Sequence, residues 1–204
     1  VCQNIKSMKG SCATVQMDSK SRGSIKKAVE FARKKFGKID ILINNAAISQ
    51  EKPFEGITDD DFDKMMNVNL RGPFSLAQEL IPDMVTNKWG RVINIVSIGG
   101  QWGGYNQVHY AASKAALINF TQSIAKIYSA QGITSNAISP GLVATDMTSF
   151  ELNTTLGRKK VSEIPAKRLG TTKEIGAAAV YLVSDEAAYI TGQTINLNGG
   201  MLFS

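Results

Sequence analysis

The sequence predicts an α/β fold in which a doubly wound parallel sheet carries helices on both faces. Short apolar runs alternate with amphipathic stretches of helical period along the 204 residues. The runs are rich in Ile, Val and Leu, as is typical of strands covered on both faces. Alternating strands and helices imply parallel strands, because each helix returns the chain to the start of the sheet. We find no internal repeat or linker and therefore expect a single domain over residues 1–204.

Four elements are predicted in the first half of the chain. They are a short strand at 11–18, a helix at 21–37, a strand at 39–47 and a long helical region at 58–88. The first helix has apolar side chains on one face and stops at Gly37, a common C-terminal signal. In the long region Thr58 or Asp59 caps the helix, and the Gly72-Pro73 pair bends or breaks it.

The second half continues the alternation. Its elements are a buried strand at 91–98, a helix at 107–131, a buried strand at 133–141, a loop region with short helices at 142–170, a helix from Thr172 to Leu182 and a last strand at 193–200. Gly132 ends the first of these helices, and Thr172 is expected to cap the second. The 142–170 region has mixed polarity with several glycines and prolines, which predicts a mobile loop that borders the substrate.

Composition argues against several classes of function. The net charge is +6, but lysine and arginine are scattered along the chain, which predicts no nucleic-acid site. No apolar run reaches the roughly 18 residues of a membrane helix. No cluster of His, Cys and acidic residues suggests a metal site. Cys2 and Cys12 have neither a disulfide framework nor a metal-ligand spacing, which predicts reduced thiols in a cytoplasmic protein.

Chemistry-bearing side chains stand where such a sheet binds its ligands, beyond the carboxyl ends of the strands. Ser97 ends one predicted strand, and Tyr110 and Lys114 follow on one face of the next helix, four residues apart. A neighbouring ammonium stabilises a phenolate and lowers the pKa of a tyrosine. Tyr110 is therefore a candidate proton donor to a carbonyl oxygen that Ser97 also binds.

Each of these residues also has a plainer interpretation. A Tyr-x-x-x-Lys pair is more often a packed tyrosine beside a lysine that extends to solvent. Ser97 is alternatively a simple strand-end serine, and Asn69, inside the helical region, a polar residue that bends the helix. Their joint occurrence, in order, at the ends of strands and helices favours a site.

The same positions carry a family resemblance, which runs from about residue 10 to residue 201. The matching segments are Asp18 after a predicted strand, NNAA at 44–47, NVNL at 67–70, IVSI at 95–98, YAASK at 110–114, SPGLVATDM at 139–147 and ITGQTINLNGGM at 190–201. Together they resemble the short-chain dehydrogenase/reductase family, most of all its 3-oxoacyl-acyl-carrier-protein reductases. The resemblance implies a Rossmann-like fold and a nicotinamide cofactor, NADP or NAD, with NADP favoured.

The resemblance also implies a role for each matching residue. Tyr110 would be the general acid/base, Lys114 would lower its pKa and hold the nicotinamide ribose, Ser97 would orient the substrate carbonyl, and Asn69 would hold a water that links Lys114 to solvent. The cofactor would be bound by Asp18, Asn44, Ala46, Tyr110, Lys114, Pro140, Gly141, Val143 and Thr145. The cofactor would supply the hydride, and the protein the position and the proton.

Two departures from the family pattern are visible. Ala47 replaces the last glycine of NNAG, and we expect the change to be tolerated unless that position has a positive φ. The family's opening strand and glycine-rich turn, T-G-x-x-x-G-x-G, have no counterpart here. We therefore expect the chain to lack the first two strands and the first helix of the fold.

The substrate suggested by the resemblance is a ketone, with a 3-oxoacyl thioester on an acyl carrier as the first hypothesis. Lys88 is a candidate contact for an acidic carrier, whereas Gln131 stands where a second basic residue is often found. A sugar or another small carbonyl or alcohol, and a non-catalytic scaffold, remain the alternatives. The resemblance further suggests a homotetramer that uses the helices at 73–87 and 107–131 and the segment 193–204.

Other residues near the candidate site have two interpretations each. His109 adjoins Tyr110 but points to another face of the helix, so a catalytic role is the lesser hypothesis. Trp102 either lines a substrate pocket or packs in the interior. The apolar residues Met147, Phe150 and Leu152 form either a lid over the substrate or ordinary anchors of their loop.

Overall fold

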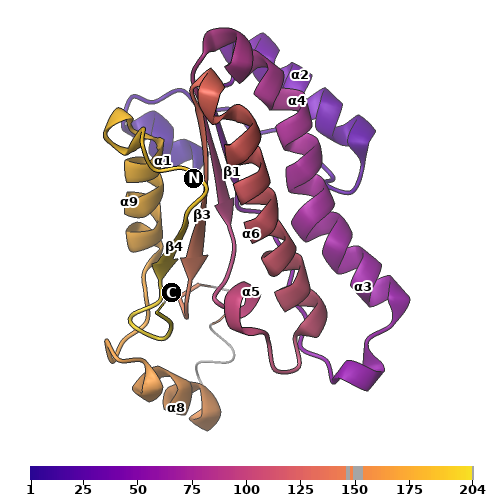
Figure 1. The fold of residues 1–204 in the computed structure, drawn as a ribbon, viewed down its shortest axis with the longest axis vertical. Helices are drawn as coiled ribbons and strands as arrows, with labels where there is room; N and C mark the ends of the chain where they lie inside the picture. Colours follow the sequence, from indigo (N-terminus) through magenta and orange to yellow (C-terminus); the bar gives the residue numbers. More distant parts are fainter. Residues whose placement is uncertain (146–147, 149–153, 204) are drawn as a thin grey trace.

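A computed structural model describes residues 1–145, 148 and 154–203 (Figure 1). Its centre is a parallel sheet with the strand order β1-β2-β3-β4. The strands are β1 (Ile41–Asn44), β2 (Gly90–Ile95), β3 (Ile133–Pro140) and β4 (Thr194–Leu197). All four point toward the end of the molecule at which α5 and α8 lie (Figure 1). The α/β class with parallel strands is therefore confirmed.

Helices connect and cover these strands. They are α1 (Cys2–Ser7), α2 (Arg22–Phe36), η1 (Phe54–Gly56), α3 (Asp59–Met66), the π-helical turn η2 (Asn67–Arg71), α4 (Gly72–Asn87), α5 (Gly99–Trp102), α6 (Val108–Tyr128), η3 (Ser129–Gln131), α8 (Thr155–Glu163), α9 (Thr172–Val183) and η4 (Asp185–Ala187). No helix in the described part of the chain is long and apolar enough to span a membrane.

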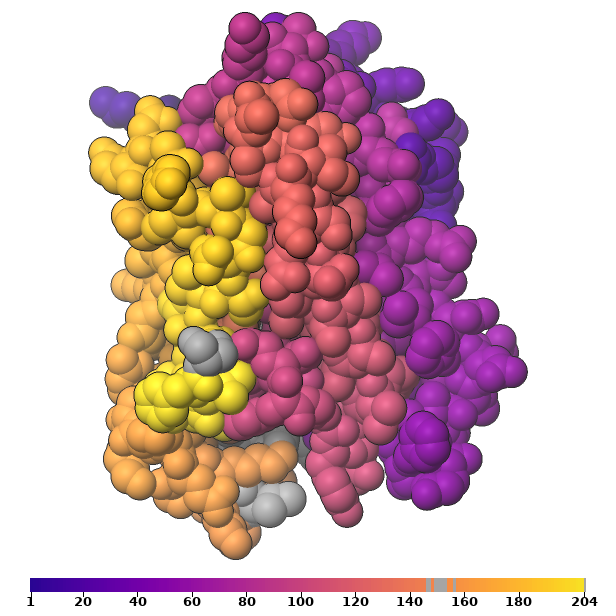
Figure 2. All heavy atoms as spheres, viewed as in Figure 1, coloured from indigo at the N-terminus to yellow at the C-terminus, as the bar shows by residue number. Residues whose placement is uncertain are grey.

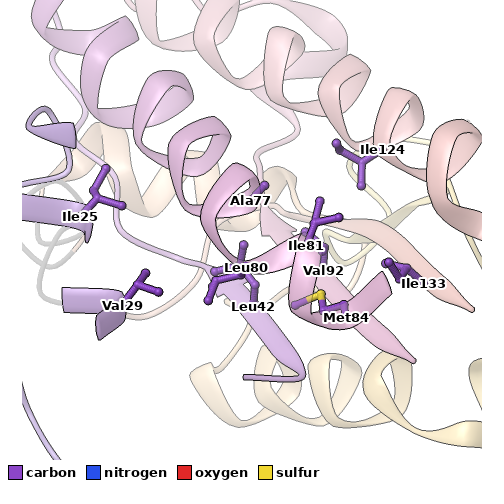
Figure 3. Packing of buried hydrophobic residues seen from close by; sticks show 10 residues of the cluster. All are labelled: Ile25, Val29, Leu42, Ala77, Leu80, Ile81, Met84, Val92, Ile124 and Ile133. Atoms are coloured by element: carbon purple, nitrogen blue, oxygen red, sulfur yellow. The ribbon is translucent and has the colours of Figure 1, made fainter. Parts of the chain in front are cut away.

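Two apolar layers hold the sheet between its helices. On one face α4 and α6 pack on the strands and α2 packs outside α4, with Leu80, Met84, Val92 and Ile133 among the buried residues (Figure 3). On the other face α9 covers β2 and β3. Burying a side chain of this size is worth about 1.5–3 kcal/mol, so these layers supply most of the stability of the sheet.

The sheet differs from expectation at its first edge. Residues 11–18 form no strand, because no described strand lies beside them to complete a hydrogen-bonded ladder. β1 is therefore an outer strand, shorter than the predicted 39–47. Ile41 and Ile43 are 39% and 47% exposed on the face opposite Leu42, where α9 covers β2 and β3. The prediction that this strand is covered on both faces is therefore wrong.

The helix ends mostly follow their sequence signals. Thr58 and Asp61 form a capping box at the start of α3. α9 is capped by Thr171 with Glu174, so the predicted cap at Thr172 is wrong by one residue. The chain is not broken at Gly72-Pro73: a π-helical turn joins α3 to α4, because a proline in the first turn of a helix needs no N–H partner.

Candidate active site

Tyr110 and Ser97 meet at the carboxyl end of the sheet. Ser97 follows β2 by two residues, and Tyr110 lies in the first turn of α6. The Ser97 hydroxyl lies close enough to the phenol to lower the pKa of Tyr110 by hydrogen bonding. The Ser97 oxygen also accepts the backbone N–H of Gly99 at 3.2 Å, which fixes its direction. The strand end and the helix start thus bring together the two hydroxyls that the sequence singled out.

Lys114 lies one turn further along α6 and is buried. Its Nζ donates to the carbonyl oxygen of Ile95 at 2.8 Å and lies 5.7 Å from the centre of the Tyr110 ring. Burial lowers the pKa of Lys114 from 10.5 to about 8, because the charged form loses its solvation. At neutral pH the side chain is still mainly an ammonium, beside the tyrosine.

The predicted effect of Lys114 on Tyr110 is wrong in this structure. The pKa of Tyr110 is raised, because burial disfavours the phenolate, and the hydrogen bond with Ser97 offsets only part of that rise. The lysine points to a backbone carbonyl and is not among the causes of the shift. Tyr110 is therefore fully protonated at neutral pH, which is the form that a proton donor requires.

Asn69 sits in the π-helical turn, a distortion that often marks functional sites. Its amide is paired with the backbone of Ile48 in both directions, N–H to Oδ1 at 2.9 Å and Nδ2 to O at 2.9 Å. Nδ2 also donates to Ser113 at 3.1 Å, and Ser113 donates to the backbone oxygen of Tyr110 at 2.7 Å. Asn69 is thus tied to the first turn of α6 through Ser113, and its predicted water link to Lys114 stays a prediction.

Asn44 ends β1 and is buried. Its Nδ2 donates to Asn94 at 2.8 Å, and Asn94 donates to Thr121 of α6 at 2.9 Å. The Oδ1 atom of Asn44 has no partner among the residues that the structure describes. A buried oxygen without a donor is costly, so this atom is suited to accept a hydrogen bond from a ligand at the end of β1.

The other predicted cofactor residues lie around the same sheet end. Asp18 and Ala46 are exposed, and Asp18 accepts the backbone N–H of Lys20 at 2.9 Å. Ala47 has no positive φ, so its methyl group causes no backbone strain there. Pro140 ends β3, and Gly141, Val143 and Thr145 follow it at the carboxyl end of the sheet.

A cavity of about 500 Å³ opens beside these residues. Its lining includes Leu142 and Gly170 from the loop region and Asn196 and Asn198 at the end of β4. Gln101 of α5 joins the ends of β3 and β4, because its Nε2 donates to Ser139 at 2.8 Å and to Asn196 at 2.6 Å. Sequence reasoning missed this role of Gln101. No local pattern marks it, since both partners lie far along the chain.

Three further predictions from the sequence concern His109, Trp102 and the apolar residues of the 142–170 region. His109 is buried and hydrogen-bonded to Gln50 at 2.8 Å, so it does point away from the reacting face. Trp102 is 51% exposed at the end of α5, which contradicts the packed alternative. Met147, Phe150 and Leu152 lie outside the described residues. Within the described ranges no group of three or more His, Cys, Asp or Glu side chains is placed to hold a metal ion.

Comparison with known proteins connects this geometry to a family. Residues 1–202 match the family model described as enoyl-(acyl carrier protein) reductase. The chain is 40% identical over 196 residues to the 3-oxoacyl-[acyl-carrier-protein] reductase FabG of Buchnera aphidicola subsp. Baizongia pistaciae, a match that covers 96% of this chain and 80% of that protein. It is also 40% identical over 178 residues to the FabG proteins of Escherichia coli K12 and Salmonella typhimurium, covering 87% of this chain and 72% of each relative.

Proposed function

This chain belongs to the short-chain dehydrogenase/reductase family of oxidoreductases, and from that membership we propose that it reduces the ketone of a 3-oxoacyl thioester to a hydroxyl with a nicotinamide cofactor. The observation that carries the proposal is that the hydroxyls of Ser97 and Tyr110 lie together, with the buried ammonium of Lys114 one helical turn further along α6. Two neighbouring hydroxyl groups, of which the phenol is protonated at neutral pH, suit a carbonyl oxygen that gains a proton.

The residues at the carboxyl end fit a dinucleotide. The unpartnered, buried Oδ1 of Asn44 calls for a donor, such as a ribose hydroxyl or an adenine amino group. Lys114 has three N–H donors and directs one of them to Ile95, so others can reach a nicotinamide ribose. Asp18 and Ala46 would border the adenosine, and Pro140, Gly141, Val143 and Thr145 would flank the nicotinamide.

Each side chain then has a defined task. A bound nicotinamide supplies the hydride to the carbonyl carbon. Ser97 donates a hydrogen bond to the carbonyl oxygen and orients it. Tyr110 gives that oxygen its phenolic proton as the alcohol forms, while the ammonium of Lys114, which is not among the groups that lower the pKa of Tyr110, would hold the nicotinamide ribose. Burial, which raises the pKa of Tyr110, keeps the donor protonated until the oxygen becomes basic.

The thioester on an acyl carrier protein is favoured by the relatives. The compared proteins carry the name 3-oxoacyl-[acyl-carrier-protein] reductase, and the matching family model is named for an acyl-carrier reductase. Lys88, the proposed carrier contact, is exposed and ends α4 in a left-handed conformation. It precedes β2 and so lies at the opposite end of the strand from Ser97. A carrier would therefore have to contact a wide surface while its long prosthetic arm reaches the site.

The direct test is turnover of acetoacetyl thioesters, on acyl carrier protein and on coenzyme A, followed by the absorbance of NADPH or NADH. Tyr110→Phe is expected to lower kcat by about 10²–10⁴-fold, the usual contribution of a general acid. Cofactor affinity, measured by NADPH fluorescence, should stay within about threefold of wild type. Turnover near wild type in the variant would refute the acid assignment. A protein that binds NADPH and reduces only sugars or other small ketones, or one that binds no cofactor at all, would refute the proposed substrate or the proposed activity.

We also infer that the chain assembles as a homotetramer. α6 runs along the face of the molecule between the C-terminal segment and α4 (Figure 2). It exposes the apolar side chains of Val108 and Ile127, and Phe203 is exposed near the C-terminus. β4 is an outer strand of the sheet, so its free edge is available to a second copy. Sedimentation velocity tests this inference, and a monomer at micromolar concentration would refute it.

A further inference from the structure

The first turn of α6 is held from outside the helix. The residue that precedes it, Gln107, makes no side-chain capping bond in the described structure. His109, the neighbour of Tyr110, is only 1% exposed. One of its ring nitrogens, Nε2, lies 2.8 Å from Oε1 of Gln50, which is 59 residues earlier in the chain. The proposed reaction uses neither side chain, so this buried contact calls for another explanation.

The partners of Gln50 determine which nitrogen of His109 carries the proton. Nε2 of Gln50 donates to Oδ1 of Asp61 at 2.9 Å. Asp61 also accepts the ammonium of Lys52 at 2.6 Å and the hydroxyl of Thr58 at 2.9 Å. Lys52 and then Gln50 hold the pKa of Asp61 well below its ordinary value, so it remains a carboxylate.

A carboxylate only accepts hydrogen bonds, so the amide nitrogen of Gln50 has to face Asp61 and the amide oxygen has to face His109. His109 must then donate from Nε2. Nδ1 is buried and has no hydrogen-bond partner in the part of the chain that the structure describes. The chain of donors therefore runs in one direction, from His109 through Gln50 to Asp61.

The segment of residues 48–52 links three elements at once. Ile48 is paired with Asn69 of the π-helical turn, and Gln50 joins His109 to Asp61 at the start of α3. The backbone N–H of Lys52 donates to the oxygen of Asn106, just before α6, at 2.7 Å. These contacts hold the first turn of α6, which has no side-chain cap of its own in the described structure.

We propose that His109 is a positioning residue: through Gln50 and Asp61 it fixes the first turn of α6, and with it the hydroxyl of Tyr110 relative to Ser97. The proposal rests on the proposed function only in that Tyr110 is the acid there. Displacing a reacting group by about 1 Å can lower a rate by about 10²-fold. A hydrogen bond on the residue next to the acid is well placed to prevent such a displacement.

Two substitutions at one position separate the hydrogen bond from the volume of the ring. In His109→Gln the amide nitrogen takes the place of Nε2 and can still donate to Gln50. In His109→Asn the only amide nitrogen takes the place of Nδ1, so the bond to Gln50 is lost. We expect His109→Asn to lower kcat at least about tenfold with little change in KM, and His109→Gln to restore most of that loss.

Gln50→Leu tests the same hydrogen bond by removing the partner of His109. It removes the same bond from a half-buried loop residue and should match the kcat loss of His109→Asn. The double variant should lose little more than either single one, because both changes break one interaction. Equal losses in His109→Asn and His109→Gln would show that packing alone matters and would overturn the proposal, as would full activity in Gln50→Leu.

Hydrogen exchange gives a readout that does not depend on activity. His109→Asn should speed amide exchange in residues 106–111 and in residues 48–52 together, whereas His109→Gln should leave both segments close to wild type. If no 3-oxoacyl thioester is turned over by the wild type, the proposed function fails while this comparison still decides the positioning role. Unchanged exchange in His109→Asn would overturn the positioning role even in an active enzyme.

Discussion

α9 and α6 both begin at the carboxyl end of the sheet, but their first turns are held in different ways. α9 is capped by its own residues: the hydroxyl of Thr171 accepts the N–H of Glu174 at 3.2 Å, and Glu174 accepts the N–H of Thr171 at 2.8 Å. Arg168, just before the helix, completes the arrangement with an ion pair to Glu174 at 2.6 Å. α6 lacks such a cap and is held through Gln50, 59 residues away from His109.

The difference separates a helix that supports the fold from one that carries the proposed proton donor. A local cap stabilises a helix wherever the helix is placed, whereas remote contacts also fix its position relative to other elements. Tyr110 must meet Ser97, which belongs to another element, so local capping would not suffice. α6 also buries the ammonium of Lys114, which costs stability. α9 has no such cost.

The largest effect should follow from removing the buried ammonium of Lys114. Lys114→Met is expected to lower kcat by about 10²-fold or more and to weaken cofactor binding, because the proposed contact of the ammonium with the nicotinamide ribose is lost. The variant should nevertheless be about 1–3 kcal/mol more stable at pH 7, since a shift of the pKa of Lys114 from 10.5 to about 8 means that burial disfavours the charged form. Urea unfolding measures the stability. A variant less stable than wild type would contradict the inference that the buried ammonium of Lys114 destabilises the fold and is kept for its function.

The pH dependence of that difference has a definite sign. Above pH 8 the folded wild type releases the proton of Lys114, whereas the unfolded chain keeps it up to about pH 10.5. The unfolded state then binds more protons, so wild-type stability rises relative to the variant. The advantage of Lys114→Met should therefore shrink between pH 8 and pH 10.5. An advantage that stayed constant would show that burial of the charge is not its source.

Two glycine substitutions with smaller expected effects test the same comparison of α6 with α9. A Cβ on Gly100 of α5 would lie 2.8 Å from the backbone carbon of Lys114, whereas a Cβ on Gly176 of α9 would meet nothing within 4 Å. Gly100→Ala should destabilise the protein by about 1–3 kcal/mol and lower activity, because α5 is pushed off α6. Gly176→Ala should stabilise it by about 0.5–1 kcal/mol without changing kcat. Thermal melts and turnover check both, and similar outcomes would remove the distinction between the two helices.

Most of the fold could be predicted from the sequence, because most elements are specified by local patterns. Helical periodicity with Gly37 and Gly132 as stops located α2 and α6, and apolar runs located β2 and β3. The strand at 11–18 was wrong because a strand needs a neighbour, and an apolar run does not reveal whether one is present. The cap of α9 was misplaced although the spacing of Thr171 and Glu174 was visible as a capping box.

The site could be predicted only in part. Helical spacing and the strand-end rule brought Tyr110, Lys114 and Ser97 together, and the structure places them so. The direction of the pKa shift of Tyr110 could not be foreseen, because burial is a property of the folded chain and here outweighs the neighbouring charge. The contact of His109 with Gln50 was equally hidden, since no local pattern links residues so far apart.

The smallest effects concern the local caps. Thr171→Ala should cost about 1 kcal/mol, the usual loss at an N-cap, and should leave kcat unchanged because no hydrogen bond in the described part of the chain joins Thr171 to the first turn of α6. Thr58→Ala removes an equivalent cap from α3 but also loosens Asp61, on which Gln50 depends. We expect the same loss of stability together with a lower kcat. Equal kcat values in the two variants would contradict the link from α3 to the first turn of α6.

Acid titration tests the local character of the α9 cap. Arg168 and then Thr171 lower the pKa of Glu174 from 4.5 to about 2 in the folded protein. A carboxyl group with a lowered folded pKa stabilises the protein above its ordinary pKa and loses that contribution as the pH falls through the lowered one. The difference in stability between wild type and Glu174→Gln should therefore be constant above pH 4.5 and vanish toward pH 2, with kcat unchanged at every pH at which the protein is folded. A change in kcat that followed this titration would mean that α9, like α6, is coupled to the site, and the contrast between a locally capped helix and a remotely held one would no longer hold.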